Sequence, residues 1–115
     1  MDSADCEVVR RLVEDVANGG RMTLVDDLVA ADFRDHAGPP GLPSDREVLK
    51  QTLASRRLFG NGGRYVISGL DARDGLVTLT LEERDGVSGK HRLRVAQGKI
   101  SEHWGVGALF ADPTP

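Results

Sequence analysis

Residues 91–106 read HRLRVAQGKISEHWGV and contain two short stretches on either side of a glycine turn. Before the turn, Leu93 and Val95 alternate with arginines, which is typical of a strand with one buried face. Gln97-Gly98 marks a tight turn, and residues 99–106 return as a second strand. The sequence therefore predicts a β-hairpin, and its register decides which side chains share the buried face.

Two turns fit this hairpin, and they place the second strand differently. A two-residue loop opposes Leu93 to Glu102, whereas a three-residue loop opposes Arg92 to Glu102. The three-residue loop also sets His91 opposite His103. We prefer it because a cross-strand pair of opposite charge is worth up to about 1 kcal/mol. The preferred register predicts one face formed by His91, Leu93, Val95, Ser101, His103 and Gly105, and an outer face formed by Ile100, Glu102, Trp104 and Val106.

The rest of the chain divides into a helical half and a strand half. Apolar residues at helical spacing predict three helices before residue 60, and a capping box at Ser44 and Glu47 opens the third. The predicted order is helices at 8–16 and 24–29, an extended piece at 33–37, a helix from 44, and strands at 64–72, 76–83, 91–95 and 99–106. This order predicts one α+β domain over residues 1–115, with three N-terminal helices packed on a curved antiparallel sheet. A curved sheet covered in this way forms a cone with a cavity.

Composition excludes several kinds of partner. The formal charge of −3 argues against nucleic acid, which requires a basic surface. Apolar runs are only a few residues long, so no membrane partner is expected. The acidic start lacks the apolar region of a signal peptide, and we expect a cytoplasmic protein. Cys6 is the only cysteine, which excludes an intrachain disulfide, and the three histidines lack metal-ligand spacing, so no metal site is expected.

Three stretches resemble the SnoaL-like polyketide-cyclase family of the NTF2-like superfamily. They are residues 31–36 (ADFRDH) followed by Asp45-Arg46-Glu47, the strand 91–95, and residues 97–104 (QGKISEHW), which are the most specific. The resemblance implies a cone-shaped α+β fold that is usually dimeric. It also implies an apolar pocket for a small hydrophobic organic molecule, and chemistry that needs no metal or cofactor.

Polyketide cyclases of this family close a ring by aldol chemistry, using an aspartate on the last strand and a histidine on the strand before it. By resemblance, the histidine position falls on His91. The aspartate position falls on Gly105, because this chain reads His103-Trp104-Gly105 where many relatives carry an aspartate after the tryptophan. The chain therefore lacks the family's general acid at that place.

Candidate site residues follow from the predicted faces. His91 and His103 would share the inner face, and histidine can give or take a proton near neutral pH. Asp35 shares the face of Phe33, where burial would raise its pKa and make it a proton carrier in place of the missing aspartate. Residues expected to contact a substrate are Tyr65, His36, Leu93, Gly105 and Trp104. An apolar outer patch of Ile100, Trp104 and Val106 would be covered in a homodimer.

Two functions remain open on these grounds. The first is a cofactor-free enzyme of cyclase or isomerase type, acting by general acid/base catalysis on a hydrophobic carbonyl-containing substrate. The second is a non-catalytic ligand-binding or dimeric scaffold domain that has lost the catalytic aspartate. Gly105 favours the scaffold, whereas the presence of both His91 and His103 favours the enzyme.

Overall fold

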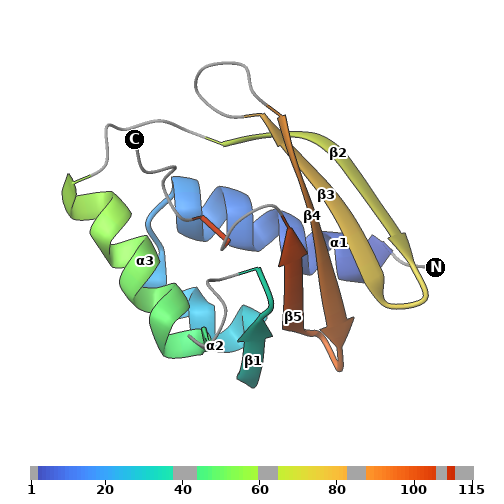
Figure 1. Ribbon diagram of the computed structural model, residues 1–115, viewed down its shortest axis with the longest axis horizontal. Coiled ribbons are helices and arrows are strands. Elements are labelled where there is room, and N and C mark those ends of the chain that lie inside the picture. Colours follow the sequence, from blue (N-terminus) through green and yellow to red (C-terminus); the bar gives the residue numbers. More distant parts are fainter. Residues whose placement is uncertain (1–2, 38–43, 60–64, 83–87, 106–108, 111–115) are drawn as a thin grey trace.

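The structure is a computed structural model that describes residues 3–37, 44–59, 65–82, 88–105 and 109–110 (Figure 1). Helix α1 (Ser3–Arg11) continues into a π-helix (Leu12–Asn18), and a short 3₁₀ turn (Met22–Leu24) leads into α2 (Val25–Leu28). The remaining elements are β1 (Val29–Asp35), α3 (Arg46–Phe59), β2 (Val66–Arg73), β3 (Leu76–Glu82), β4 (Ser88–Ala96) and β5 (Lys99–Gly105). The α+β class predicted from the sequence is confirmed. No helix in the described ranges is long and apolar enough to cross a membrane.

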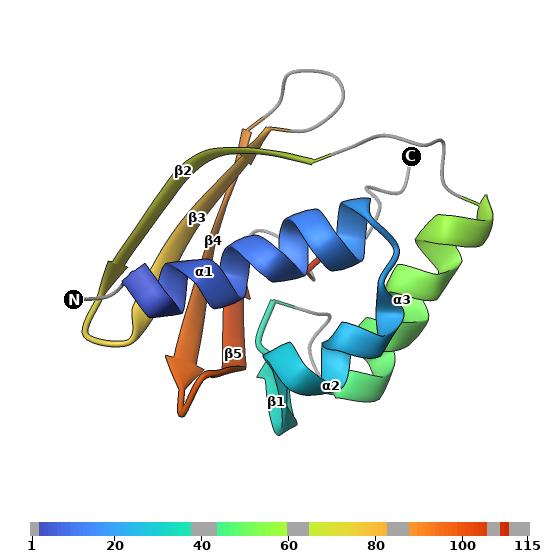
Figure 2. The same cartoon turned by 180° about the vertical axis from the view of Figure 1, so that it is seen from behind.

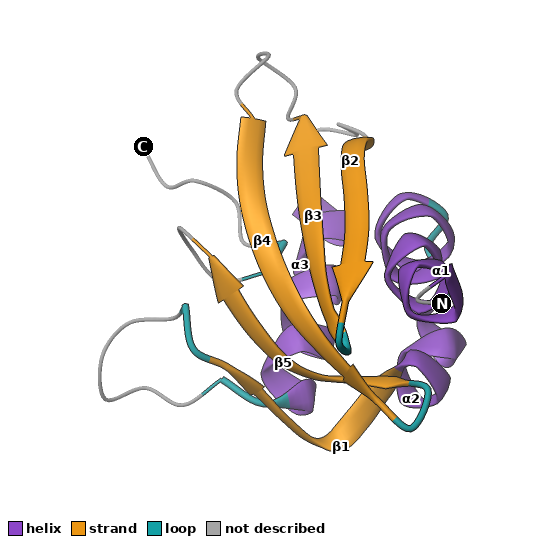
Figure 3. Ribbon diagram, turned by 90° about the vertical axis from the view of Figure 1, so that its right-hand side faces the viewer, coloured by secondary structure: helices purple, strands orange, loops and turns teal. Residues whose placement is uncertain are grey.

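The five strands form one mixed sheet in the order β1-β5-β4-β3-β2 (Figure 3). Strands β2 to β5 are an antiparallel meander, as predicted, but β1 pairs with β5 in parallel. The prediction of a wholly antiparallel sheet is therefore wrong at β1. A tight hairpin forces its two strands to be antiparallel, whereas α3 and three strands separate β1 from β5 in the chain.

The β4–β5 hairpin differs from the preferred register. Gln97 and Gly98 both have positive φ (54° and 78°), as a two-residue type I′ turn requires, and Ala96 pairs with Lys99. A bulge then leaves Ser101 without a cross-strand partner, so Arg94 faces Glu102. The three-residue loop is wrong, and so is the pairing of Glu102 with Arg92.

This bulge decides which side chains of β5 are buried. Before it, Ile100 points into the core and is fully buried, although the sequence pattern placed it outside. After it, His103 is fully buried and shares the inner face with His91 and Leu93, as predicted. One extra residue in the strand allows Ile100 and His103, which are three positions apart, to face the same side.

The third helix begins one residue later than its predicted capping box. Asp45 is the residue before the helix, and its Oδ1 accepts a hydrogen bond from the N–H of Val48 at 3.0 Å. Ser44 instead bridges to β1, where its carbonyl accepts the N–H of Asp35 at 2.9 Å. This bridge ties the start of α3 to the end of β1.

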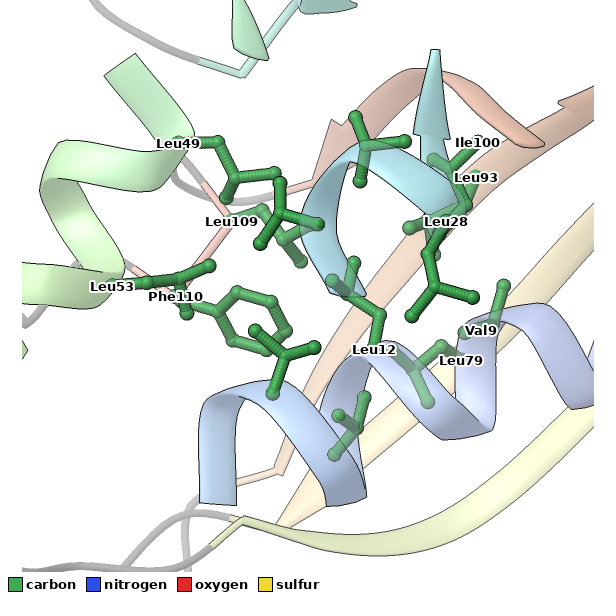
Figure 4. Close-up of a cluster of buried hydrophobic side chains, with 14 of the residues drawn as sticks. Val9, Leu12, Leu28, Leu49, Leu53, Leu79, Leu93, Ile100, Leu109 and Phe110 are labelled. Carbon is green, nitrogen blue, oxygen red and sulfur yellow. The ribbon is translucent and has the colours of Figure 1, made fainter. Parts of the chain in front are cut away.

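The core lies between the helices and the inner face of the sheet. Strands β2 to β4 bend around α1, and the inner residues of β3 (Val77, Leu79 and Leu81) are buried (Figure 2). The side chains of Leu49 and Leu53 from α3 gather with Leu109 and Phe110, which come from the turn after β5 (Figure 4). The described C-terminal turn is therefore part of the core.

Candidate active site

Three polar side chains form a continuous hydrogen-bonded chain inside the protein. Nδ1 of His103 lies 2.7 Å from Oδ1 of Asp35, and Nε2 of His103 lies 2.8 Å from Nδ1 of His91. The side chain of Asp35 is 4% exposed, and His103 and His91 are 0% and 7% exposed. The three residues that the sequence proposed for proton transfer are thus in direct contact.

Strand register explains why these side chains meet. Asp35 ends β1 and is the register partner of His103 on β5, and the N–H of His36 donates to the carbonyl of His103 at 2.8 Å. On the other side of β5, Gly105 is the cross-strand partner of His91 on β4. Because Leu93 is the direct partner of His103, His91 is its diagonal neighbour, and the hydrogen-bonded residues Asp35, His103 and His91 come from three neighbouring strands.

The carboxylate of Asp35 is held by hydrogen bonds from three directions. The N–H of Leu109 donates to Oδ2 at 2.9 Å, and the N–H of Ala37 and Nδ1 of His103 reach Oδ1 at 3.0 and 2.7 Å. Burial raises the pKa of Asp35, but the hydrogen bond and charge of His103 and the two N–H groups outweigh it, and the pKa lies below its usual value. The predicted raised pKa is therefore wrong, because the carboxylate is buried among donors.

His91 behaves differently from an exposed histidine. Burial first, and the neighbouring His103 second, lower the pKa of His91 from 6.5 to about 4, against a smaller opposing effect of Asp35. The imidazole of His91 is therefore neutral at neutral pH. A neutral imidazole with one free lone pair can accept a proton, which is the property required of a general base.

The partners of each nitrogen assign the protons along the chain. Because the Asp35 carboxylate is an acceptor, Nδ1 of His103 carries a proton and donates it. In the state with an uncharged His103 ring, Nε2 of His103 is an acceptor and Nδ1 of His91 donates to it. This leaves the lone pair of His91 on Nε2, and among the described residues this nitrogen has no hydrogen-bond partner. The hydrogen-bonded series of side chains thus begins with a proton-accepting nitrogen on His91 and ends with the carboxylate of Asp35.

His36 and Trp104, predicted to contact a substrate, lie together on the opposite side of the sheet from this chain. Their rings are stacked with centroids 5.1 Å apart, and the guanidinium of Arg94 lies 5.9 Å from the Trp104 ring. Glu102 forms ion pairs with Arg94 at 3.4 Å and with His36 at 3.8 Å. Trp104 is outside, as the register argument expected, but it is partly covered by neighbours within its own chain.

The outer patch proposed for dimerisation is also smaller than predicted. Ile100 is buried in the core, and Val106 lies outside the described residues. Only Trp104 of the three predicted residues is placed on the outer face.

Tyr65 and Leu93 are core residues in the structure. Leu93 is fully buried, and the ring of Tyr65 lies 5.3 Å from the ring of Phe110. The side-chain amide of Asn18 pairs with both the N–H and the carbonyl of Tyr65 at 2.9 Å. These contacts fix the start of β2 against the first helix.

Sequence reasoning missed the backbone groups of Ala37 and Leu109. Both donate N–H groups to Asp35, and a backbone donor leaves no mark in residue type. The adjacent apolar pair Leu109 and Phe110 was the only available signal that the chain returns to the core after β5. Within the described ranges, no group of three or more histidine, cysteine, aspartate or glutamate side chains could hold a metal ion.

Comparison with known proteins identifies the class through structure. No protein-family model and no curated protein matches the chain. Solved structures do match over most of its length, and they include proposed polyketide cyclases, a proposed isomerase of the SnoaL-like family and an NTF2-like protein. The chain therefore shares its fold with these SnoaL-like and NTF2-like structures, as the resemblance in its sequence predicted.

Three of these structures illustrate the likeness. IdmH, a proposed polyketide cyclase from Streptomyces antibioticus, is 23% identical with a TM-score of 0.75, over 88% of this chain and 89% of IdmH. A proposed SnoaL-like isomerase from Agrobacterium tumefaciens is 18% identical with a TM-score of 0.67, over 90% and 96% of the two chains. An NTF2-like protein of unknown function from Mesorhizobium loti is 22% identical with a TM-score of 0.66, over 90% and 89%.

Proposed function

We propose that the chain is a cofactor-free enzyme of cyclase or isomerase type that moves protons on a small hydrophobic substrate containing a carbonyl group. The observation that carries this proposal is the buried chain Asp35–His103–His91. The fold supports it, because similar structures include a proposed polyketide cyclase and a proposed isomerase. A C–H group next to a carbonyl is acidic enough for a positioned imidazole to remove its proton.

The proposed reaction begins at His91, the first residue of the hydrogen-bonded series His91–His103–Asp35. Nε2 of His91 takes the proton from the substrate carbon, and the C–H electron pair moves into an enolate. His91 passes its Nδ1 proton to Nε2 of His103, which becomes an imidazolium beside the Asp35 carboxylate. In a cyclase the enolate carbon then attacks a second carbonyl, and in an isomerase the enolate is protonated at a different carbon. In both cases Nε2 of His91 gives its proton to the product, and His103 returns a proton to Nδ1 of His91.

Each residue has a distinct role in this scheme. His91 is the group that touches the substrate, since its neutral imidazole offers Nε2 as a base. Asp35 stays ionised and compensates the positive charge on His103, as a carboxylate does in other hydrogen-bonded acid/base systems. General acid/base catalysis of this kind contributes about 10²–10⁴-fold in rate.

The scaffold alternative depended on Gly105, which leaves the family's acid position empty. Asp35 supplies a carboxylate to the histidine chain from β1, so the lack of an acid on β5 is a weaker argument against an enzyme. We retain the homodimer through the outer sheet face as a part of the proposal, with Trp104 at its centre. A monomeric mass in sedimentation at micromolar concentration would contradict that part.

Hydrogen exchange at carbon tests the proposed chemistry without knowledge of the natural substrate. Aromatic ketones that can form enolates are incubated with the protein in D₂O, and loss of the proton next to the carbonyl is followed by NMR. The wild type should accelerate exchange in at least one ketone, and His91→Gln should reduce the rate by about 10²-fold or more. Asp35→Asn should also reduce it, whereas Asp27→Asn, an exposed carboxylate on α2, is the matched control.

Equal exchange rates in the wild type and His91→Gln would contradict the role of His91. Binding of the ketones without any accelerated exchange would favour the ligand-binding scaffold. Each result is interpretable only if the variants remain folded, which circular dichroism of the same samples establishes.

A further inference from the structure

Gly105 lies against the hydrogen bond between the two histidines. A Cβ atom built at this position would be 2.8 Å from Nδ1 of His91 and 3.1 Å from Nε2 of His103. These are the same two atoms that lie 2.8 Å apart in the His91–His103 contact. A carbon atom cannot approach a ring nitrogen to 2.8 Å without displacing it, so the contact as it stands has no room for a side chain at position 105.

The second glycine near His91 is not under the same constraint. A Cβ built on Gly89 would lie 3.5 Å from Nε2 of His91, which is ordinary van der Waals contact. Both glycines lie at the ends of strands and flank the same imidazole. The close approach is therefore a property of position 105 and not of glycines around His91 in general.

We propose that Gly105 is a positioning residue, whose missing side chain allows the imidazoles of His91 and His103 to share a direct hydrogen bond. The role of Gly105 in a reaction rests on the proposed function, but the hydrogen bond between His91 and His103 exists without a substrate. The two imidazoles can exchange a proton along this bond because the two nitrogens are in direct contact at 2.8 Å. Gly105 acts on the proton chain only through the positions of His91 and His103.

The lack of an acid at position 105 of β5 follows from the space that the two histidine rings occupy. An aspartate at 105 would add a Cβ and a carboxylate where the two rings now touch. The strand can therefore carry either a side-chain acid at this position or the direct His91–His103 contact in its present geometry, but not both. In this chain the carboxylate comes from β1 as Asp35 and reaches the histidines from the other side.

The closing experiment compares Gly105→Ala with Gly89→Ala in the full chain by ¹⁵N NMR of the histidine rings. In the wild type, the Nδ1 signal of His91 and the Nε2 signal of His103 should show one shared proton. Gly105→Ala should remove that signature, because the added Cβ displaces Nδ1 of His91 from Nε2 of His103. Gly89→Ala should leave the signature unchanged. An unaltered shared proton in Gly105→Ala would overturn the proposal.

A double variant keeps the inference testable if Gly105→Ala does not fold. His91→Ala removes the atom nearest to the added Cβ but keeps His103 at 3.1 Å, so alanine at 105 should lower the urea midpoint of His91→Ala by less than it lowers that of the wild type. If alanine at 105 destabilises His91→Ala as much as the wild type, the steric argument is wrong. These NMR and unfolding results are independent of turnover, so a failure of the enzyme proposal and a failure of this inference can be told apart.

Discussion

Acid should destabilise this protein through His91 well before its carboxylates are protonated. In the unfolded chain His91 takes up a proton near pH 6.5, whereas in the folded protein it does so only near pH 4. Between these values the unfolded state binds more protons, so stability falls as the pH falls from 6.5 to 4. Above pH 6.5 the histidine is neutral in both states and contributes no pH dependence.

The size of this effect follows from the two pKa values. One pKa unit corresponds to about 1.4 kcal/mol, so the difference between 6.5 and about 4 lowers the free energy of unfolding by about 3 kcal/mol at pH 4. His91 is 7% exposed, and solvent screening therefore reduces the effect little. The lowered pKa of Asp35 adds a further loss only below its usual value of 3.8.

Urea unfolding at pH 7, 5.5 and 4 measures this loss, with Trp104 as the only tryptophan reporter. His91→Gln should lose about 3 kcal/mol less than the wild type between pH 7 and pH 4, whatever its stability at pH 7. Parallel pH profiles for the wild type and His91→Gln would refute the burial of a neutral His91.

Four other substitutions test three separate parts of the structure by urea unfolding at pH 7. Ile100→Ala should cost about 2–5 kcal/mol and Ser101→Ala less than about 0.5, and the reverse order would contradict the bulge. Phe110→Ala should cost about 3–5 kcal/mol, because its ring is buried, and a small loss would mean that the C-terminal turn lies outside the core. Asp35→Asn should cost about 1–3 kcal/mol, because an amide cannot accept all three hydrogen bonds that the carboxylate accepts, and unchanged stability would argue against these hydrogen bonds.

Alternation along the strands could be interpreted from the sequence, because it depends only on each residue and its near neighbours. Leu93 and Val95 on β4 were placed correctly for this reason. The bulge was not predictable, because Ser101 fits a regular strand as well as a bulged one. Cross-strand charge pairing was a poor guide to register, since Glu102 finds an arginine, Arg94, in the bulged pairing too.

In the candidate site, the sequence also predicted what depends on neighbouring residues and missed what depends on residues far away in the chain. The sequence suggested His91, His103 and Asp35 as candidates from residue type and predicted face. The pKa of Asp35 was predicted to shift in the wrong direction, because burial is outweighed by His103 first and then by backbone donors that include the N–H of Leu109, 74 residues away. A backbone N–H supplied from such a distance is a consequence of the folded chain path, and no pattern around Asp35 encodes it.

The parallel pairing of β1 with β5 also has a kinetic consequence. Asp35 and His103 are 68 residues apart, whereas each hairpin of the meander joins strands that are close in sequence. Contacts between distant residues close large loops and form late in folding. The meander can therefore form first, with β1 adding to its edge afterwards. Until that step the Asp35 carboxylate is solvated and His103 lacks its partner, so the proton chain is completed only when the sheet is completed.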